Sequence, residues 1–475
     1  MTSKLGDWHD LKQCKHIIVA SSSGYSPDCT NHLLELSKMS ALPDFPKEVG
    51  KIISFFSQDG AKQICLINIH KAEKSFKNIE IIRSLIHKIG GNEPLGFCFV
   101  VENTETILDL SIAVALSSYK IGLFKKDQKT DHRVHTICGE KLNEAILARA
   151  ENIAICMKFA MELVDLPPNV KTPDYAKNWV KNECEKRGLP CEVVSDEDLT
   201  NKGFGAITAV GQASKYGSHL MKISYFGKSS TTNIDLVLIG KGVTFDTGGI
   251  SLKDHTNMHY MKSDLGGAAA VLGALFLTND LGISANITVI VPFVENAIDA
   301  NSCRPGDVIT GYGGQTIEII DTDAEGRLIL SDALAYAVKD IKAETIIDLA
   351  TLTGNVVSAL GYSAAGLFSN NEELSQKLKE SGEATGERCW PMPMWEEYAE
   401  MMQSDIADIK NFHGRPIVGA ITAAKFLEFF VNEHPKWAHL DIAGVAFGDN
   451  AIAKSKLATG FGVRLLVDYI EKNIA

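Results

Sequence analysis

The amino-acid sequence predicts an α/β protein with two domains: a smaller N-terminal α/β domain and a larger C-terminal domain whose mixed central sheet is covered by helices on both faces. Three observations lead to this prediction. Short apolar runs alternate with helical patterns along the chain. The later runs are continuously apolar, as in strands that are buried on both faces. A long amphipathic pattern ends at a pair of prolines, which marks a boundary.

The N-terminal part contains three predicted strands and a predicted helix between the second and the third. The strands are expected at 16–20 (HIIVA), 63–69 (QICLINI) and 95–101 (LGFCFVV), and the helix at 78–89. A succession of strand, helix and strand is typical of an α/β domain. This region has no cluster of the residue types that commonly carry out catalysis.

A single long helix is predicted over residues 140–165, where apolar residues recur with helical spacing. It is followed by Pro167 and Pro168, and shortly afterwards by Thr172 and Pro173. Because proline cannot continue a helix, we expect the domains to join here. The predicted domains are residues 1–165, which include this linking helix, and residues 166–475.

The C-terminal part continues the alternation with a richer apolar content. A helix of small residues is predicted at 264–278. The predicted strands are 234–239, 287–294, 315–321, 346–350 and 437–442.

Composition and charge exclude several classes of protein. The chain has 475 residues and a net charge of −12, which argues against nucleic acid or an anionic membrane as the main partner. Its ten cysteines form no CxxC pair, which is typical of an intracellular protein with reduced thiols. The first residues are polar and resemble no secretory signal, and no apolar run approaches the ~20 residues of a membrane-spanning helix. We therefore expect a cytoplasmic protein without a membrane partner.

Charged residues cluster directly after the predicted strands, where open α/β sheets bind their ligands. Several carboxylates at one sheet edge repel one another unless cations lie among them. Carboxylate-rich sites suit magnesium, manganese or zinc. The clustered residues are Lys241, Asp246, Lys253, Asp264, Asp321, Asp323, Glu325 and Arg327.

Other interpretations of these segments are weaker. The segment 321–332 resembles a calcium EF-hand loop, but Asp332 stands where a glutamate is expected. Asp246 lies in an Asp-Thr-Gly motif, yet an aspartic protease needs two of them. His255 and His259 have metal-ligand spacing without the glutamate of HExxH, so we predict a structural or solvent-exposed role. We expect His439 to be a hydrogen-bonded core residue. Taken alone, Asp264 could be a helix cap.

Taken together, the motifs resemble the leucine aminopeptidase family of cytosolic di-metal exopeptidases. The resemblance rests on VTFDTGGISLK (243–253), MKSDLGGAAA (261–270) and DTDAEGRL (321–328). Four further segments add to the resemblance: LVDLPPNVKTP, DLATLTG, WAHLDIAG and GFGVRLL. It covers roughly residues 150–475, whereas the N-terminal region shows little motif resemblance.

The resemblance implies two divalent metal ions per subunit, zinc by preference, with manganese or magnesium exchangeable at one site. Asp246 and Glu325 would bridge the two ions. Asp323 would bind the first ion, and Lys241 and Asp264 the second. A lysine can bind a metal only as the neutral amine, which adjacent cations would favour.

The resemblance also implies an aminopeptidase that uses a metal-activated water to release an N-terminal residue, with a preference for leucine or other apolar residues. Lys253 would polarise the scissile carbonyl, and Arg327 would hold a bicarbonate that acts as general base. The partners would be peptides with a free N-terminus, and the assembly a homohexamer. The implied substrate-pocket residues are Met261, Thr351, Gly354 and Ala443.

One residue departs from the family pattern: Asp321 stands where the motif usually has asparagine. If the segment is extended, Asp321 and Asp323 share a face, and the added charge would alter metal preference or substrate choice. The alternative is that Asp321 turns to a backbone amide or to solvent and acts as asparagine would.

Two other functions stay open: a protein of this fold retained for binding or assembly without catalysis, and nucleic-acid binding, which the net charge disfavours.

Overall fold

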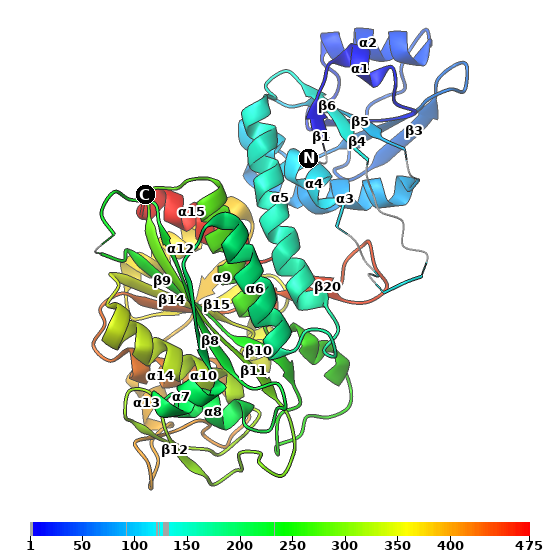
Figure 1. Cartoon of the computed structure of the whole chain (residues 1–475). Helices are drawn as coiled ribbons and strands as arrows, with labels where there is room; N and C mark the ends of the chain where they lie inside the picture. The colour runs from blue at the N-terminus through cyan, green and yellow to red at the C-terminus, as the bar shows by residue number, and fades with distance from the viewer. Residues whose placement is uncertain (1–2, 92, 120–121, 123, 127–132, 232) are drawn as a thin grey trace. The chain divides into compact units, whose positions relative to one another are not determined.

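The computed structural model describes residues 3–475 except 92, 120–121, 123, 127–132 and 232 (Figure 1). The chain forms two compact units, residues 1–158 with 450–454 and residues 159–449 with 455–475. The helix α5 (Glu144–Asp165) continues from the first unit into the second. The domain join proposed after residue 165 lies at the end of that helix. Within the described part of the chain, no helix is long and apolar enough to cross a membrane.

The first unit is built on a six-stranded sheet with the order β1-β6-β5-β2-β4-β3, in which only β3 is antiparallel to its neighbour. Helices α1 and α2 pack on one face, and α3 and α4 on the other (Figure 1). The three strands and the helix predicted here are confirmed. The elements are β1 (Ser3–Leu5), α1 (Trp8–Leu11), β2 (His16–Ser21), α2 (Pro27–Ser37), β3 (Ile52–Phe56), β4 (Gln63–Asn68), η1 (Ala72–Lys77), α3 (Asn78–Ile89), β5 (Leu95–Val100), α4 (Thr104–Leu116) and β6 (His135–Gly139).

The second unit contains a nine-stranded sheet with the order β16-β15-β18-β14-β9-β11-β8-β7, and β10 pairs with β11. Strands β9, β11, β14 and β18 are parallel to their neighbours among these four, and β16 is parallel to β15. The pairs β15–β18, β8–β11 and β7–β8 are antiparallel, so the sheet is mixed as predicted. The strands are β7 (Cys191–Ser195), β8 (His219–Phe226), β9 (Leu236–Gly240), β10 (Gly242–Asp246), β11 (Asn286–Asn296), β14 (Thr345–Ala350), β15 (Ala365–Ser369), β16 (Cys389–Pro391) and β18 (Trp437–Asp441).

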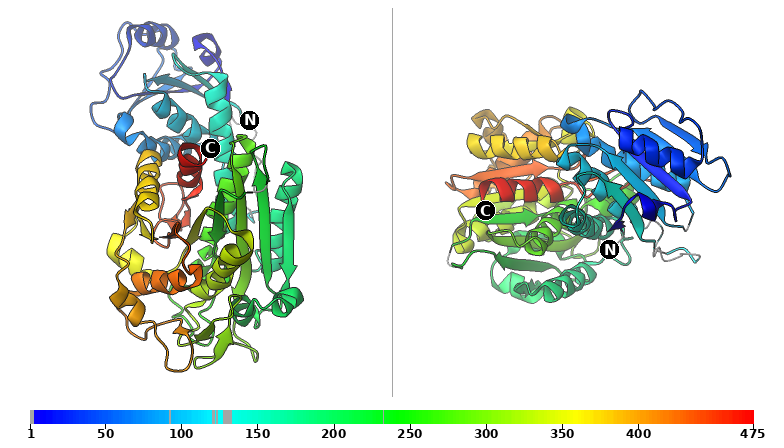
Figure 2. Two further views of the ribbon diagram at one scale, coloured as in Figure 1. Left: turned by 90° about the vertical axis from the view of Figure 1, so that its left-hand side faces the viewer. Right: turned by 90° about the horizontal axis from the view of Figure 1, so that it is seen from above.

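Helices cover both faces of this sheet, which confirms the predicted fold class (Figure 2). On one face α6, α9, α15 and α12 contact one another in turn, and on the other α10 packs between α8 and α14. The helices are α6 (Pro173–Arg187), α7 (Asp196–Asn201), α8 (Gly205–Gly211), η2 (Met258–Ser263), α9 (Gly266–Asp280), α10 (Glu325–Tyr336), η3 (Ala337–Ile341), α11 (Gly354–Leu360), α12 (Glu372–Thr385), α13 (Glu396–Glu400), α14 (Gly419–Val431) and α15 (Val463–Asn473).

One predicted strand is wrong in length and in partners. Residues 315–321 were expected in the main sheet, but the strand is only β13 (Thr316–Glu318) and pairs with β12 (Val308–Thr310) and β17 (Ile409–Lys410) in a separate sheet. Beyond it, the backbone amides of Ile320 and Asp321 bond to the side chain of Asn411 instead of a strand. The alternating sequence pattern contains no sign of this side-chain partner. The remaining short strands are β19 (Phe447–Gly448) and β20 (Leu457–Ala458).

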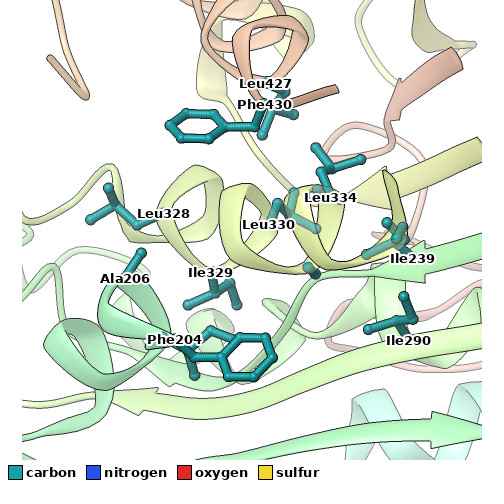
Figure 3. Close-up of a cluster of buried hydrophobic side chains, with 14 of the residues drawn as sticks. Phe204, Ala206, Ile239, Ile290, Leu328, Ile329, Leu330, Leu334, Leu427 and Phe430 are labelled. Atoms are coloured by element: carbon teal, nitrogen blue, oxygen red, sulfur yellow. The ribbon is translucent and has the colours of Figure 1, made fainter. Parts of the chain in front are cut away.

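Helix α10 is buried from its first residue to Ala335. Its apolar side chains Ile329, Leu330 and Leu334 pack in a cluster with residues of α8, α14, β9 and β11 (Figure 3). The first turn of the same helix carries Glu325 and Arg327. The core therefore fixes the position of two charged side chains that a surface helix would leave mobile.

We expect Leu330→Ala to lower the free energy of unfolding by about 2–5 kcal/mol, because the substitution leaves a cavity beside helices that cannot fully collapse. Leu330 is fully buried, whereas Leu252 is 59% exposed and supplies the control substitution Leu252→Ala. Urea denaturation of both variants measures the difference. A loss below about 1 kcal/mol for Leu330→Ala would contradict the described core.

Candidate metal centre

Six charged side chains converge where β9, β10 and the start of α10 meet. Lys241 follows β9 directly, and Asp246 is the last residue of β10. The Nζ atom of Lys241 lies 2.8 Å from Oδ1 of Asp264 and 2.9 Å from Oε1 of Glu325. The Nζ atom of Lys253 lies 2.9 Å from Oδ2 of Asp246 and 2.5 Å from Oδ1 of Asp323.

Three of the carboxylates form the tightest group. Asp246, Asp323 and Glu325 each offer an oxygen atom, and these atoms lie within 4.8 Å of one another. With Asp264, the site holds four carboxylates against two ammonium groups. Its formal charge of −2, when all groups are ionised, requires further cations in so small a volume.

The backbone around the site is shaped to receive these side chains. The Oδ1 atom of Asp246 accepts hydrogen bonds from the amide of Gly248 and from Nδ2 of Asn296, both at 2.8 Å. A Cβ atom at Gly326 would lie 2.5 Å from Cε of Lys241. Only glycine therefore lets Lys241 lie across the first turn of α10 and reach Glu325.

Burial dominates the electrostatics of the acids. It raises the pKa of Asp246 and Asp264, and raises the pKa of Asp323 to about 7 with help from the charge of Asp246. In Glu325, Lys241 and Lys253 outweigh burial and lower the pKa. Burial alone would lower the pKa of either lysine, but the surrounding carboxylates raise both. Without added metal, the lysines are the counter-ions of the acids.

The donor set fits divalent metal ions. The Oδ2 atom of Asp264 and the Oε2 atom of Glu325 are buried and accept no hydrogen bond within the described structure. Such oxygens are costly to bury unless a cation or donor meets them. Asp264 is no helix cap, since α9 begins at Gly266 and its N-cap residue, Leu265, makes no side-chain bond. Carboxylate oxygens together with a lysine amine suit zinc, manganese or magnesium.

Arg327 lies behind the acids and is 5% exposed. Its Nη1 donates to the carbonyl oxygen of Asn411 at 2.8 Å, and its Nε is buried with no acceptor within the described structure. Burial lowers the pKa of Arg327 to about 10, so it still carries its charge at neutral pH. Asn411 is not predicted from the sequence, and its side chain also donates to the carbonyl of Asp321. No motif marks Asn411, because it comes from a distant strand end.

The extended conformation assumed for Asp321 is wrong. Residues 322 and 323 form a turn, and Oδ1 of Asp321 accepts the backbone amide of Asp323 at 2.9 Å. An asparagine oxygen accepts the same bond. The structure therefore has the second of the two predicted arrangements, in which Asp321 turns to a backbone amide.

The four predicted pocket residues lie on loops and helices of the second unit. Thr351 follows β14, and its Oγ1 donates to Oδ1 of Asp264 at 2.9 Å, while its carbonyl accepts Nζ of Lys241 at 3.0 Å. Gly354 begins α11, Met261 lies in η2, and Ala443 follows β18. Of these four, Thr351 is bonded directly to the carboxylate–lysine cluster.

The rival interpretations fail in the structure. Asp332, the last position of the supposed calcium loop, is fully buried in α10 and accepts the amides of Ala206, Ile207 and Tyr312. His255 and His259 are exposed and stand outside the cluster of acids. His439 is buried, and its Nδ1 lies 2.6 Å from Oδ1 of Asp348, as predicted for a core histidine.

A family model of the catalytic domain of the cytosol aminopeptidase family matches residues 158–467. The chain belongs to this family. A probable cytosol aminopeptidase of Chlorobium phaeobacteroides is 44% identical over 68% of this chain and 64% of its own length, so the match spans less than two thirds of that relative. The crystal structure of the cytosol aminopeptidase from Coxiella burnetii is 28% identical, with a TM-score of 0.84 over 100% of both chains.

A second solved structure, described as the bottromycin maturation enzyme BotP in complex with Mn, is 26% identical, with a TM-score of 0.84 over 97% of this chain and 99% of that one. These comparisons confirm the resemblance to the leucine aminopeptidases that the motifs indicate. The cytosol aminopeptidase fold extends over both units of the chain, whereas the family model begins near the end of the first.

We expect the affinity of this cytosol aminopeptidase homologue for manganese to fall as the pH drops below 7. The pKa of Asp323 is about 7 without metal, so a metal ion must displace a proton at lower pH. One displaced proton corresponds to about a tenfold loss of affinity per pH unit. Calorimetric titration between pH 5.5 and 8 measures this slope.

The matched variant is Asp323→Asn, which should bind manganese more weakly and with a shallower dependence on pH. An affinity of the unaltered protein that stays constant between pH 7.5 and 5.5 would contradict the protonation of Asp323. It would also show that the acids are ionised throughout that range.

Proposed function

We propose that the protein is a metal-dependent aminopeptidase that removes leucine or another apolar residue from the N-terminus of peptides. The observation that carries the proposal is the cluster of four carboxylates and two lysines, in which two buried carboxylate oxygens have no donor among the described residues. Membership of the cytosol aminopeptidase family supports it. The chain would act in the cytoplasm, as the names of its relatives indicate for them, and as a homohexamer.

The proposed metal ligands are those that the family resemblance implies, and the contacts within the cluster support them. Asp246 and Glu325 would serve both ions, Asp323 the first, and Lys241 with Asp264 the second. Zinc is the expected metal, with manganese or magnesium exchangeable at one site. When bound, two such ions lower the pKa of a shared water and so supply a nucleophile at neutral pH.

The two lysines would have different tasks because they differ in exposure. The side chain of Lys241 is 3% exposed and that of Lys253 is 22% exposed. Lys241 is enclosed by Asp264 and Glu325 and would lose its proton to bind metal. Lys253 can reach a substrate from the open side, remain an ammonium ion and donate a hydrogen bond to the oxyanion that develops on the scissile carbonyl.

Arg327 would hold a bicarbonate that accepts a proton from the attacking water. Its guanidinium is charged and buried, and its Nε is free within the described structure to bind such an anion. Four residues would surround the N-terminal side chain of the substrate: Met261, Thr351, Gly354 and Ala443. Ala443 packs against an apolar cluster that includes Val356 and Phe368, which favours an apolar side chain there.

Hydrolysis of leucinamide by the purified protein tests the proposed activity. We expect turnover that is abolished by a chelator, restored by zinc or manganese, and at least about tenfold higher in kcat/KM than turnover of glutamic acid amide, because a charge is costly to bury beside an apolar wall. Metal content measured on the same sample shows how many ions each chain binds. Full metal occupancy without turnover of any amino-acid amide would contradict the proposal and favour a binding or assembly role.

Substitution of each lysine separates the two proposed tasks. Lys253→Ala should retain both metals and lose roughly 10²–10³-fold in kcat, as expected for the loss of one oxyanion donor. Lys241→Ala should instead lose metal from one site. Lys181→Ala, on the exposed side of α6, is the control and should change neither quantity. Equal metal loss in the Lys241 and Lys253 variants would contradict the division of tasks.

A further inference from the structure

The first unit contains a cavity of about 870 Å³, far from the carboxylate–lysine cluster in sequence. It is bordered by Ser22 and Ser23 after β2, by Glu102 and Asn103 after β5, and by Glu140 after β6. The cavity therefore lies at the carboxyl ends of three parallel strands. Its volume is within the usual range of small-molecule sites.

The connections of the strands explain why a cavity forms there. Strands β2 and β5 are parallel neighbours, but β2 is followed by α2 on one face of the sheet and β5 by α4 on the other. The two connections diverge and leave a crevice between them. Open α/β sheets bind ligands where the connections of two neighbouring strands run to opposite faces of the sheet.

The charge of the lining selects the class of ligand. Four carboxylates border the cavity, and no lysine or arginine does so among the described residues. The N-termini of α2 and α4 each supply a partial charge of only about +0.5. Four negative charges outweigh these two helix ends, so the cavity favours a cation over a phosphate. The carboxylates are Asp7, Asp28, Glu102 and Glu140.

Two of these carboxylates are available to a ligand. Asp7 accepts the amide of Asp10 as the cap of α1, and Asp28 lies 3.4 Å from the ring of His32. Glu102 and Glu140 are exposed and have no ion-pair or hydrogen-bond partner within the described structure. They follow β5 and β6, which are adjacent in the sheet, so both stand at the same rim of the cavity.

The rest of the lining suits an apolar or aromatic group. The ring of Trp8 stacks on His32 with centroids 4.8 Å apart, and Tyr25 lies nearby in the lining. The buried thiols of Cys29, Cys98 and Cys138 also border the cavity. A ligand with a flat apolar body could displace water from these surfaces while its charged end stays near the carboxylates.

We propose that this cavity binds a small organic cation, a primary amine or a guanidine, that carries an aromatic or apolar group. The ammonium or guanidinium group would lie between Glu102 and Glu140, and the apolar part would lie against Trp8 and Tyr25. The site is separate from the proposed peptidase chemistry and does not depend on it.

Titration of the full-length protein with tryptamine tests the proposal, and tryptophol is the matched neutral compound. We expect saturable binding of tryptamine, at least about tenfold weaker binding of tryptophol, and weakening of tryptamine binding by added salt. Agmatine carries a guanidinium but no aromatic group, so its titration tests whether a guanidinium suffices for binding. Adenosine monophosphate tests the opposite charge.

The variants Glu102→Gln and Glu140→Gln should each weaken tryptamine binding several-fold, and together at least about tenfold. Glu105→Gln is the control, since Glu105 is an exposed acid in the first turn of α4 that does not line the cavity. Unaltered melting temperatures show that the variants fold. Equal binding of tryptamine and tryptophol, binding of the phosphate alone, absence of saturable binding, or unchanged affinity in the double variant would overturn the proposal.

Discussion

The mutual repulsion of four clustered carboxylates, three of them buried, is the constraint on which the second unit depends. Asp246, Asp264, Asp323 and Glu325 can share one small volume only because Lys241 and Lys253 are bonded among them. Their burial strengthens attraction and repulsion alike. The structure meets this constraint by placing the acids at the end of β10, before α9 and at the start of α10, where the core fixes their positions.

The same constraint explains the apolar character of α10. A helix that begins with a buried glutamate and carries a buried arginine two residues later is expensive to place in a protein interior. Ile329, Leu330 and Leu334 offset this cost by packing between the sheet and α14 (Figure 3). The packing of the apolar side chains of α10 therefore holds its charged side chains in place.

Much of this arrangement is readable from the sequence, because short apolar strands and the charged residues that follow them are local signals. The positions of Asp246, Asp323 and Glu325 after predicted strands indicate the carboxylate cluster, although the strand before Asp323 is shorter than predicted and lies in a separate sheet. Contacts between distant segments could not be predicted from the sequence. One example is Asn411, which follows β17 and bonds to Arg327 and to the turn at Asp321. For Asp321 the sequence leaves two arrangements open, because a pattern that alternates like a strand does not reveal the bond between Asp321 and the amide of Asp323.

In both units, carboxylates gather at the carboxyl ends of parallel strands. The two sets of carboxylates differ in how deeply they are buried. In the second unit three of the four are buried, each lies beside a lysine, and oxygens of Asp264 and Glu325 accept no hydrogen bond within the described structure, so a strongly charged, dehydrated metal ion matches them. In the first unit Glu102 and Glu140 stay exposed at the rim of a wide cavity. Hydrated carboxylates bind a metal ion weakly but can pair with an organic cation, whose apolar part supplies the remaining affinity. Burial of the carboxylates, more than their number, therefore decides which kind of cation each unit is suited to bind.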